Sequence, residues 1–331
     1  MRLAHLPCFA ILLLSLVGMR VEANCTMEKL ASLPATVRDG RIFVPGSIEG
    51  HPVEFLVDLA APTLLLKGAS RDFSVFPNNL HAVPTAMVGN LPVEHLPLKV
   101  AGSIANFGAP QAVAILGRDF FYIFDVEFDI HNHVITLFNP KDCQDANLAY
   151  WTSNYNVLTM HKNFTHFVNL PPVFSPYIYP HINLDVKLNG RPILAALDSG
   201  YRETSVSLTA AHDAGIDRGD AGVAHIDNTP DLLDGYGTQT WLATFDSVSL
   251  DSETIRPTAL RFHDFWGGGA QTGTGLPVGG ATGSVEMVLG ADFLVSHRVL
   301  ISYSQHKVYF SYAGGTPFST GPSSAEPALT P

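Results

Sequence analysis

The chain has 331 residues, of which 46% are hydrophobic and 15% are charged, as in soluble proteins large enough to bury two cores. It carries 19 Lys and Arg against 30 Asp and Glu, a formal net charge of −11. Nucleic acids and anionic membranes bind concentrated basic surfaces, and the sequence has no cluster of Lys or Arg. The composition therefore argues against both of these partners.

The first 23 residues have the pattern of an export signal. Arg2 and His5 precede an apolar run at residues 8–17, and Val21 and Ala23 place small side chains before a cleavage point after Ala23. We therefore expect a secreted or periplasmic mature protein. The apolar run is shorter than the roughly 20 residues of a helical span. No integral membrane span is expected after signal removal, and a retained N-terminal anchor is the alternative.

Two cysteines, Cys25 and Cys143, remain once the signal is removed. In an oxidising compartment such a pair predicts a disulfide. It would close a loop of roughly a hundred residues and stabilise the first half by about 4 kcal/mol at most. Two unpaired buried thiols are the alternative. Cys/His metal spacings are absent and His131 and His133 fall in an expected turn, so no metal or cofactor is expected.

The first half reads as short strands and turns. Apolar runs separated by Gly, Pro or polar pairs predict strands at residues 42–44, 53–57 and 64–66. Residues 124–130 alternate apolar and polar side chains, and after a turn at Asn132 and His133 they are followed by the apolar run 134–138. This pattern predicts a β-hairpin with one buried face.

The second half repeats that hairpin at residues 299–312. Helix is expected only in short segments, at 209–214 and after each Leu-Gly-x-Asp-Phe block. The glycine-dense stretch 267–283 lacks the preceding strand and the Lys-Ser/Thr of a phosphate-binding loop, so it predicts a mobile loop. The resulting division is a signal peptide at 1–23, a first lobe at 24–145, a linker at 146–180, a second lobe at 181–313 and a disordered tail at 314–331.

The two halves are copies of each other. Gly50 and Gly190, Pro52 and Pro192, and Asp58 and Asp198 are each separated by 140 positions, and residues 115–120 recur as 288–293. The chain is therefore an internal duplication in which each copy places one aspartate directly after an apolar strand.

This duplication makes Asp58 and Asp198 a candidate catalytic pair. If the lobes pack about a pseudo-twofold axis, the two aspartates meet at that axis. Two adjacent carboxylates cannot both ionise, so they share a proton, and one acts as base while the other acts as acid. A water held between them can then be activated to attack a carbonyl group.

The second copy resembles a family motif closely. It reads Ala196-Leu197-Asp198-Ser199-Gly200 and is followed by an apolar strand at 204–208 and by Val288-Leu289-Gly290. On these residues the chain resembles the pepsin and retropepsin aspartic proteases in their single-chain, bilobal form. The resemblance implies an all-β fold of two pseudo-symmetric acid-protease β-barrel lobes with a cleft between them, and a monomer that acts on a peptide or protein substrate.

The resemblance also assigns roles to residues. Asp58 and Asp198 would be catalytic, and Ser199 and Gly200 would support the pair. Tyr236, between two glycines, is a candidate for the aromatic residue of a flap over the cleft, although an ordinary turn tyrosine fits the sequence equally well.

The first copy departs from the motif because Leu59 and Ala60 replace its Thr/Ser-Gly. Leu59 cannot make the hydroxyl contact to the other lobe, and Ala60 adds a methyl group where space is short. Three hypotheses follow: an exported aspartic endopeptidase, a catalytically impaired relative that binds extended peptides by strand addition, or a structural protein in which both aspartates are satisfied loop carboxylates. The geometry of the two carboxylates discriminates best among them.

Overall fold

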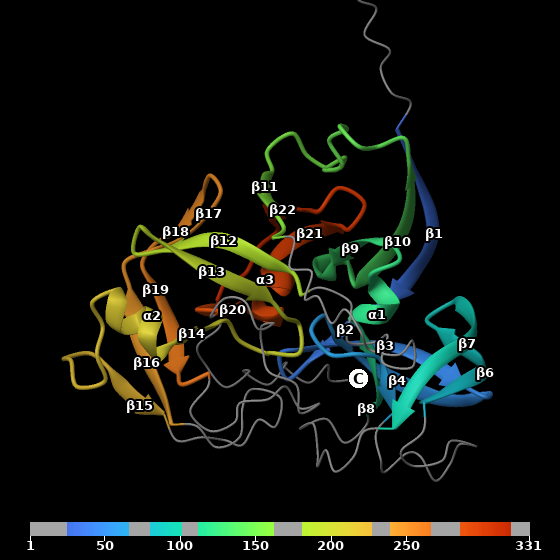
Figure 1. Cartoon of the computed structure of the whole chain (residues 1–331), viewed down its shortest axis with the longest axis horizontal. Helices are drawn as coiled ribbons and strands as arrows, with labels where there is room; N and C mark the ends of the chain where they lie inside the picture. The colour runs from blue at the N-terminus through green and yellow to red at the C-terminus, as the bar shows by residue number, and fades with distance from the viewer. Residues whose placement is uncertain are drawn as a thin grey trace, which may run out of the picture.

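The structure is a computed structural model and describes residues 25–65, 80–100, 112–161, 181–226, 239–265 and 285–318. Within these ranges the chain forms three β-sheets and a few short helices. Two sheets build the lobes seen at the left and right of Figure 1, and the strands of the third lie in the upper centre and right of the same view. The expected all-β class is confirmed.

The first lobe contains a seven-stranded sheet in the order β2-β3-β4-β8-β5-β7-β6. Its strands are β2 (Thr36–Arg38), β3 (Arg41–Ile48), β4 (His51–Asp58), β5 (Leu64–Leu65), β6 (Leu80–Val88), β7 (Leu91–Val100) and β8 (Ala112–Gly117). The last four residues of β4 are buried on both faces of the sheet. This burial explains why they form a continuous apolar run that ends in Asp58 rather than an alternating one.

The second lobe contains a nine-stranded sheet in the order β15-β16-β19-β14-β20-β13-β12-β17-β18. Its strands are β12 (Asn183–Leu188), β13 (Arg191–Leu197), β14 (Ser205–Ser207), β15 (Ala224–Ile226), β16 (Thr240–Phe245), β17 (Val248–Leu250), β18 (Glu253–Ile255), β19 (Thr258–His263) and β20 (Met287–Leu289).

Six strands of each lobe follow the same path. The order β3-β4-β8-β5-β7-β6 in the first lobe corresponds to β12-β13-β20-β14-β19-β16 in the second. The direction of each pairing also matches: β4 is parallel to β8 as β13 is to β20, and β5 is antiparallel to β8 as β14 is to β20. Order and direction both repeat, so the lobes are two copies of one fold, as the sequence predicts.

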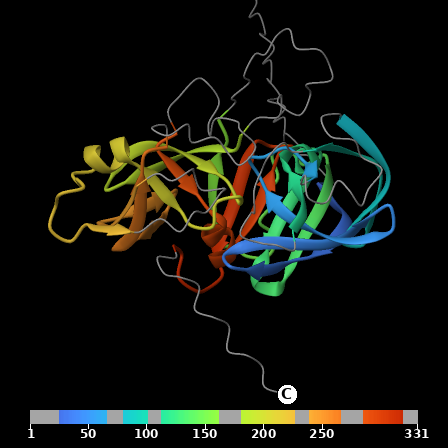
Figure 2. The ribbon, with the colours of Figure 1, turned by 90° about the horizontal axis from the view of Figure 1, so that it is seen from below.

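The third sheet joins the lobes and has the order β1-β10-β9-β21-β22-β11. Its strands are β1 (Thr26–Pro34), β9 (Asp125–Asp129), β10 (Val134–Lys141), β11 (Asn156–Thr159), β21 (His297–Ser302) and β22 (Lys307–Tyr312). Outward from the central pair β9 and β21, the strands β10 and β1 of the first half match β22 and β11. Figure 2 shows the red C-terminal strands between the yellow-orange lobe and the blue-green lobe. The pseudo-twofold axis therefore passes between β9 and β21.

The helices are short, as expected. They are α1 (Arg118–Phe121), α2 (Leu208–Asp213), α3 (Ala291–Ser296) and the 3₁₀ turn η2 (Ile130–Asn132). The Ser207 hydroxyl caps α2 by accepting a hydrogen bond of 3.1 Å from the Ala210 amide. The helices α1 and α3 begin within the repeated Leu-Gly-x-Asp-Phe block, directly after its glycine, which is earlier than the sequence suggested.

The repeated hairpins β3–β4 and β12–β13 turn in the same way. Glu49 and Gly50 have φ angles of 50° and 83°, and Asn189 and Gly190 have φ angles of 48° and 80°. Two successive left-handed residues form the tight turn that matches the twist of paired strands. The glycines at positions 50 and 190 recur in both copies because this turn requires positive φ.

The β9–β10 hairpin forms where expected, but the expectation of one buried face is wrong. All five residues of β9 are buried, including Asp125 and Glu127. The strand lies in the middle of the third sheet, where the Ser302 hydroxyl donates to Asp125 at 2.7 Å and Arg298 pairs with Glu127. Alternation in a sequence does not distinguish a polar face in water from one buried against partners.

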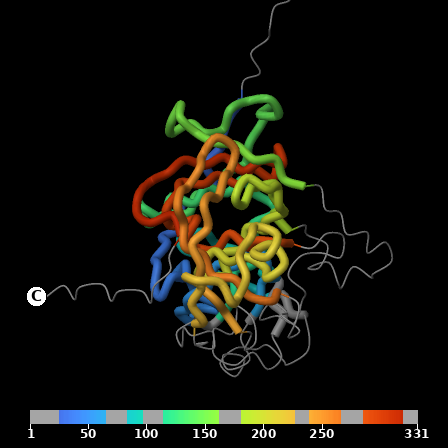
Figure 3. Tube along the Cα trace, turned by 90° about the vertical axis from the view of Figure 1, so that its left-hand side faces the viewer, coloured from blue at the N-terminus to red at the C-terminus, as the bar shows by residue number. Residues whose placement is uncertain are grey.

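Two of the expected domain boundaries differ from the described chain. Part of the expected linker is strand β11, which pairs with β22, and the green stretch leading to it lies at one end of the molecule (Figure 3). The segment expected to be a disordered tail includes Phe318, which is only 3% exposed and packs into the core. The described chain therefore continues beyond residue 313 and places an aromatic side chain in the core.

Cys25 and Cys143 lie at disulfide-bonding distance. They flank the paired ends of β1 and β10, where Thr26 lies opposite Lys141. The bond thus fastens the outer edge of the third sheet. In the described part of the chain no helix is long and apolar enough to cross a membrane. The expected signal at 1–23 lies outside the described residues.

Candidate active site

The two aspartates occupy equivalent positions at the ends of equivalent strands. Asp58 is the last residue of β4 and lies opposite Gly117 of the parallel strand β8. Asp198 follows β13, and its amide donates to the Leu289 carbonyl of the parallel strand β20 at 2.9 Å. The residues are 4% and 2% exposed. Each carboxyl group is thus held at the end of a rigid central strand, away from bulk water.

The structure brings the two carboxyl groups together. The Asp198 carboxyl lies close enough to Asp58 to affect the pKa of Asp58. Both groups also border Gly200: a methyl group added there would come within 2.6 Å of Asp58 Oδ2 and 3.0 Å of Asp198 Oδ1. These distances are too short for any side chain, so only glycine fits beside the pair.

Backbone amides hold one oxygen of each carboxyl group. The Gly200 amide donates to Asp198 Oδ1 at 2.9 Å, and the Ala60 amide donates to Asp58 Oδ1 at 2.9 Å. Asp58 Oδ1 also accepts from the Ala61 amide at 2.8 Å. The methyl group of Ala60 does not keep its amide from the carboxylate, because the Ala60 backbone approaches as closely as that of Gly200.

The environment of Asp58 favours its protonated form. Burial raises the pKa of Asp58 above its ordinary value, and the amides of Ala61 and Ala60, the Asp198 carboxyl and the Arg118 guanidinium oppose this increase. Because burial is the larger effect, the pair retains a proton to higher pH than an exposed aspartate would. A proton shared between two buried carboxyl groups is the state that acid–base catalysis by such a pair requires.

One hydroxyl group connects the two aspartate loops. Ser199 Oγ donates to the Val57 carbonyl at 2.9 Å and accepts from the Leu59 amide at 3.1 Å. Ser199 is fully buried, so this contact crosses between the lobes without competition from water. The reciprocal contact is missing because Leu59 has no hydroxyl, and its side chain packs into the core instead.

Each aspartate loop is also supported by a polar network within its own lobe, and these two networks were not identified from the sequence. Thr63 Oγ1 donates to Asp119 Oδ1 at 2.6 Å, and the Gly117 amide donates to Thr63 Oγ1 at 3.0 Å. The second lobe repeats this network, with Thr204 Oγ1 donating to Asp292 Oδ1 at 2.7 Å and Gly290 donating to Thr204 Oγ1 at 3.1 Å. The acidic residue that recurs at the same place in both Leu-Gly-x-Asp-Phe blocks is the sequence signal that could have revealed these networks.

A buried cation near the pair was also missed. Arg118 is 4% exposed, and its positive charge is attracted to Asp58 and Asp198 as well as to Asp119. Burial lowers the pKa of Arg118, and the three carboxyl groups oppose this effect. Its Nη1 lies 2.7 Å from His181 Nε2. No repeated residue marks Arg118 in the sequence, because the corresponding residue of the second block is Ala291.

The remaining predicted site residues lie elsewhere. Tyr236 is outside the described residues, although the strands that flank it, β15 and β16, pair antiparallel with Ile226 opposite Thr240. His131 and His133 are exposed. Across the described ranges no group of His, Cys, Asp and Glu side chains is arranged to hold a metal ion.

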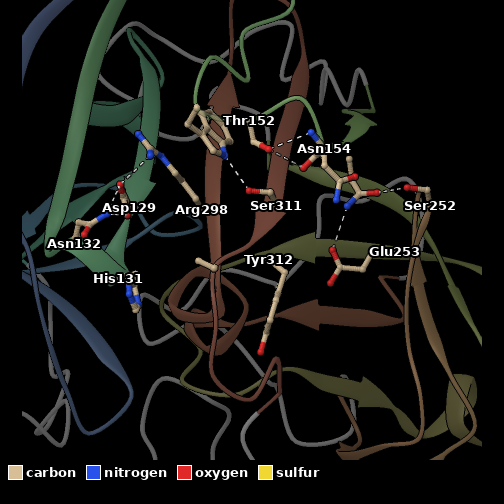
Figure 4. Close-up of a pocket in the computed structure, with 13 residues that line it drawn as sticks. Asp129, His131, Asn132, Thr152, Asn154, Ser252, Glu253, Arg298, Ser311 and Tyr312 are labelled. Atoms are coloured by element: carbon tan, nitrogen blue, oxygen red, sulfur yellow. Dashed lines mark hydrogen bonds and ion pairs between the residues drawn. The ribbon is translucent and has the colours of Figure 1, made fainter.

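A cavity of about 660 Å³ is lined by residues of the third sheet and its connecting loops and by Ser252 and Glu253 of the second lobe (Figure 4). Its polar groups pair with one another: Arg298 with Asp129 at 3.3 Å, and Trp151 Nε1 with Ser311 Oγ at 2.9 Å. None of its lining residues belongs to either loop. The cavity is therefore not part of the candidate site.

Comparisons with known proteins add little beyond the fold. No protein-family profile and no curated protein sequence matches the chain. Among solved structures, the chain is similar to an aspartic proteinase from Irpex lacteus, with 12% identity and a TM-score of 0.43 over 85% of this chain and 97% of the other. A likeness at this level is no basis for assigning an activity, so the site has to be interpreted from its own geometry.

Proposed function

We propose that the protein is an exported aspartic-type endopeptidase in which Asp58 and Asp198 activate a water between them to hydrolyse peptide bonds. One observation carries the proposal: two buried carboxyl groups from duplicated loops border the same glycine, close enough for one to affect the pKa of the other. A structural role for satisfied loop carboxylates does not account for this meeting of two acidic groups, because burying them together costs stability.

The chemistry needs one proton on the pair. The ionised carboxylate takes a proton from the water, and the water oxygen bonds to the carbonyl carbon. The protonated carboxyl gives its proton to the carbonyl oxygen. When the resulting diol collapses, the C–N bond breaks and the leaving nitrogen takes up a proton. Because the pKa of Asp58 is raised, we propose that hydrolysis is favoured at acidic to weakly acidic pH.

The rest of the proposal concerns the substrate and the setting. The substrate is an extended peptide or protein segment bound between the lobes, with Tyr236 as a candidate flap residue. The protein acts as a monomer in the secreted or periplasmic space after signal cleavage at Ala23. Ser199 and Gly200 support the pair, since one bridges the loops and the other leaves room for both carboxyl groups.

A second function is favoured by one specific feature, the missing hydroxyl at Leu59. With only Ser199 bridging the loops, the pair is fastened from one side. A misplacement of about 1 Å can cost around a hundredfold in rate. The alternative is therefore a catalytically impaired relative that binds extended peptides by strand addition.

The test is cleavage of a peptide library across a range of pH, with and without a transition-state mimic of aspartic proteases. The endopeptidase proposal expects cleavage at acidic pH that the mimic inhibits and that Asp198→Asn loses. Retained binding of library peptides without cleavage at any pH would establish the second function instead. If the protein neither cleaves nor binds the library peptides, both functions are overturned. N-terminal sequencing of the secreted protein tests export separately.

A further inference from the structure

Two positions related by the duplication make hydrogen bonds from one lobe to the other beside the aspartates. Arg41, the first residue of β3, is only 2% exposed, and its Nη1 donates to the Gly200 carbonyl of the second lobe at 2.7 Å. The neighbouring Gly40 packs on the Arg202 side chain, with its added methyl position 3.3 Å from Arg202 Cβ. The start of β3 therefore lies directly against the second aspartate loop.

The position equivalent to Arg41 is His181, which follows it by the same interval that separates Leu59 from Ser199. His181 Nε2 lies 2.7 Å from Nη1 of Arg118 in the first lobe. Burial and the charge of Arg118 lower the pKa of His181 to about 3, so the ring is neutral and accepts the hydrogen bond. Arg118 directly follows Gly117, the strand partner of Asp58. Each of these two cross-lobe hydrogen bonds, which we call ties, thus ends next to one of the two aspartates.

The Arg41 tie acts on the residue that sets the geometry of the pair. Gly200 lies beside both carboxyl groups: a methyl group added there would come within 2.6 Å of one and 3.0 Å of the other, so a small shift of this backbone toward the pair changes the space around it. A buried guanidinium holds a carbonyl strongly, because losing that partner would leave part of a charge unsatisfied in the interior. The tie therefore limits how far the second loop can shift relative to the first lobe.

We propose that Arg41 is a positioning residue for the aspartate pair: it supplies, through Gly200, the cross-lobe contact that Leu59 cannot make. Ser199 fastens the loops from the second lobe, and Arg41 fastens them from the first. The Arg118–His181 contact is the duplicated counterpart of the Arg41 tie. The catalytic part of this inference rests on the proposed endopeptidase function, whereas the positional part does not.

Arg41→Met is the decisive variant, because it keeps an unbranched apolar stem like that of arginine and removes the guanidinium donors. Arg38→Met is the matched control, since Arg38 lies three residues earlier and pairs with Glu54 inside the first lobe. For Arg41→Met we expect kcat to fall by about tenfold to a hundredfold with KM within about twofold, as for a small misplacement of reacting groups. Arg38→Met should change neither.

Amide hydrogen exchange gives a readout that does not depend on activity. The Leu59 amide donates to Ser199 Oγ across the lobes, while the Thr63 amide donates to Asp119 at 2.7 Å within the first lobe. In Arg41→Met the Leu59 amide should exchange at least about ten times faster relative to the Thr63 amide, since only the cross-lobe contact loosens. If the wild type hydrolyses no peptide, the proposed function fails. The ratio of the Leu59 and Thr63 exchange rates still tests whether Arg41 holds the two loops together.

Two further variants keep the inference falsifiable. Arg41→Lys retains the charge and one donor, so it replaces Arg41→Met if that variant does not fold, and an intermediate loss is expected. Adding Leu59→Thr to the Arg41 variant should increase the rate by a larger factor than adding it to the wild type. The reason is that the Arg41 contact and the new threonine hydroxyl would both hold the two aspartate loops together. An unchanged Leu59 to Thr63 exchange ratio in both Arg41 variants, or equal effects in Arg38→Met, would overturn the proposal.

Discussion

The two aspartate loops share a backbone hydrogen bond to the carboxyl group but make different side-chain contacts with the opposite lobe. In both, the amide two residues after the aspartate donates to its Oδ1 at 2.9 Å. The second loop, with Ser199 and Gly200, provides a cross-lobe hydroxyl and a residue without a side chain where the two carboxyl groups lie too close for one. The first loop, with Leu59 and Ala60, provides neither. The carboxylate position thus depends on the strand and backbone, whereas the coupling between the loops depends on side chains that only one copy kept.

This difference also shows that the pair is not symmetric. A methyl group is present at Ala60, but at Gly200 it would come within 2.6 Å of Asp58 Oδ2. If the loops were related by an exact twofold axis, the Ala60 methyl would press on Asp198 in the same way. The Asp58 carboxyl therefore lies closer to the second loop. Only the second loop needs a residue without a side chain, at Gly200, to make room for the pair.

Removing either carboxylate should have the largest effect. Asp198→Asn and Asp58→Asn each leave a single carboxyl group that cannot serve as both acid and base, so hydrolysis should fall by at least about a hundredfold to ten-thousandfold. Initial rates on a cleaved library peptide, together with circular dichroism, measure this. Full activity in either folded variant would show that the duplicated pair is not the catalytic group.

Next in size is the space beside the pair. Gly200→Ala places a methyl group 2.6 to 3.0 Å from both carboxyl groups, so the carboxyl groups must separate, and a loss of around a hundredfold in kcat/KM is expected. Ala60→Gly is the matched control in the first loop and should change kcat/KM by less than about threefold, since the Ala60 amide already reaches Asp58. Similar losses in the two variants would contradict the asymmetry of the loops.

Restoring the missing hydroxyl should have a smaller and opposite effect. Leu59→Thr gives the first loop a group that can bridge to the other lobe, so we expect the rate to rise by about tenfold if one-sided fastening limits it. Combining it with Ala60→Gly should add little. Because Leu59 is 1% exposed and packs in the core, some loss of stability accompanies the change. An inert variant that still binds extended peptides would favour the binding function.

The smallest effect concerns stability and pH. The pKa of Asp58 is raised in the folded state, mainly by burial, so the folded protein holds more protons than the unfolded chain between the two pKa values. Stability therefore falls as pH rises from the ordinary aspartate pKa through the raised one. Asp58→Asn lacks this loss, and its gain over wild type should grow from acidic to neutral pH in urea unfolding. A difference that is constant with pH would contradict the raised pKa.

The sequence by itself determined the duplication, the all-β class and the pair of aspartates, because these depend on strand periodicity and on positions counted along the chain. It also placed the short helices to within a few residues, and the glycines at positions 50 and 190, used there only to align the repeats, proved to meet a local backbone requirement for positive φ. These features need no knowledge of what lies across the molecule.

Only the tertiary structure decided which side chains hold the pair together. Arg41 and Gly200 are 159 residues apart and Ser199 and Val57 are 142 apart, and no local pattern marks such partners. The same holds for the buried carboxylates of β9, which alternate like an exposed face but find partners in the third sheet. A buried polar group is stable only where another element supplies its partner, so its role depends on how the lobes pack.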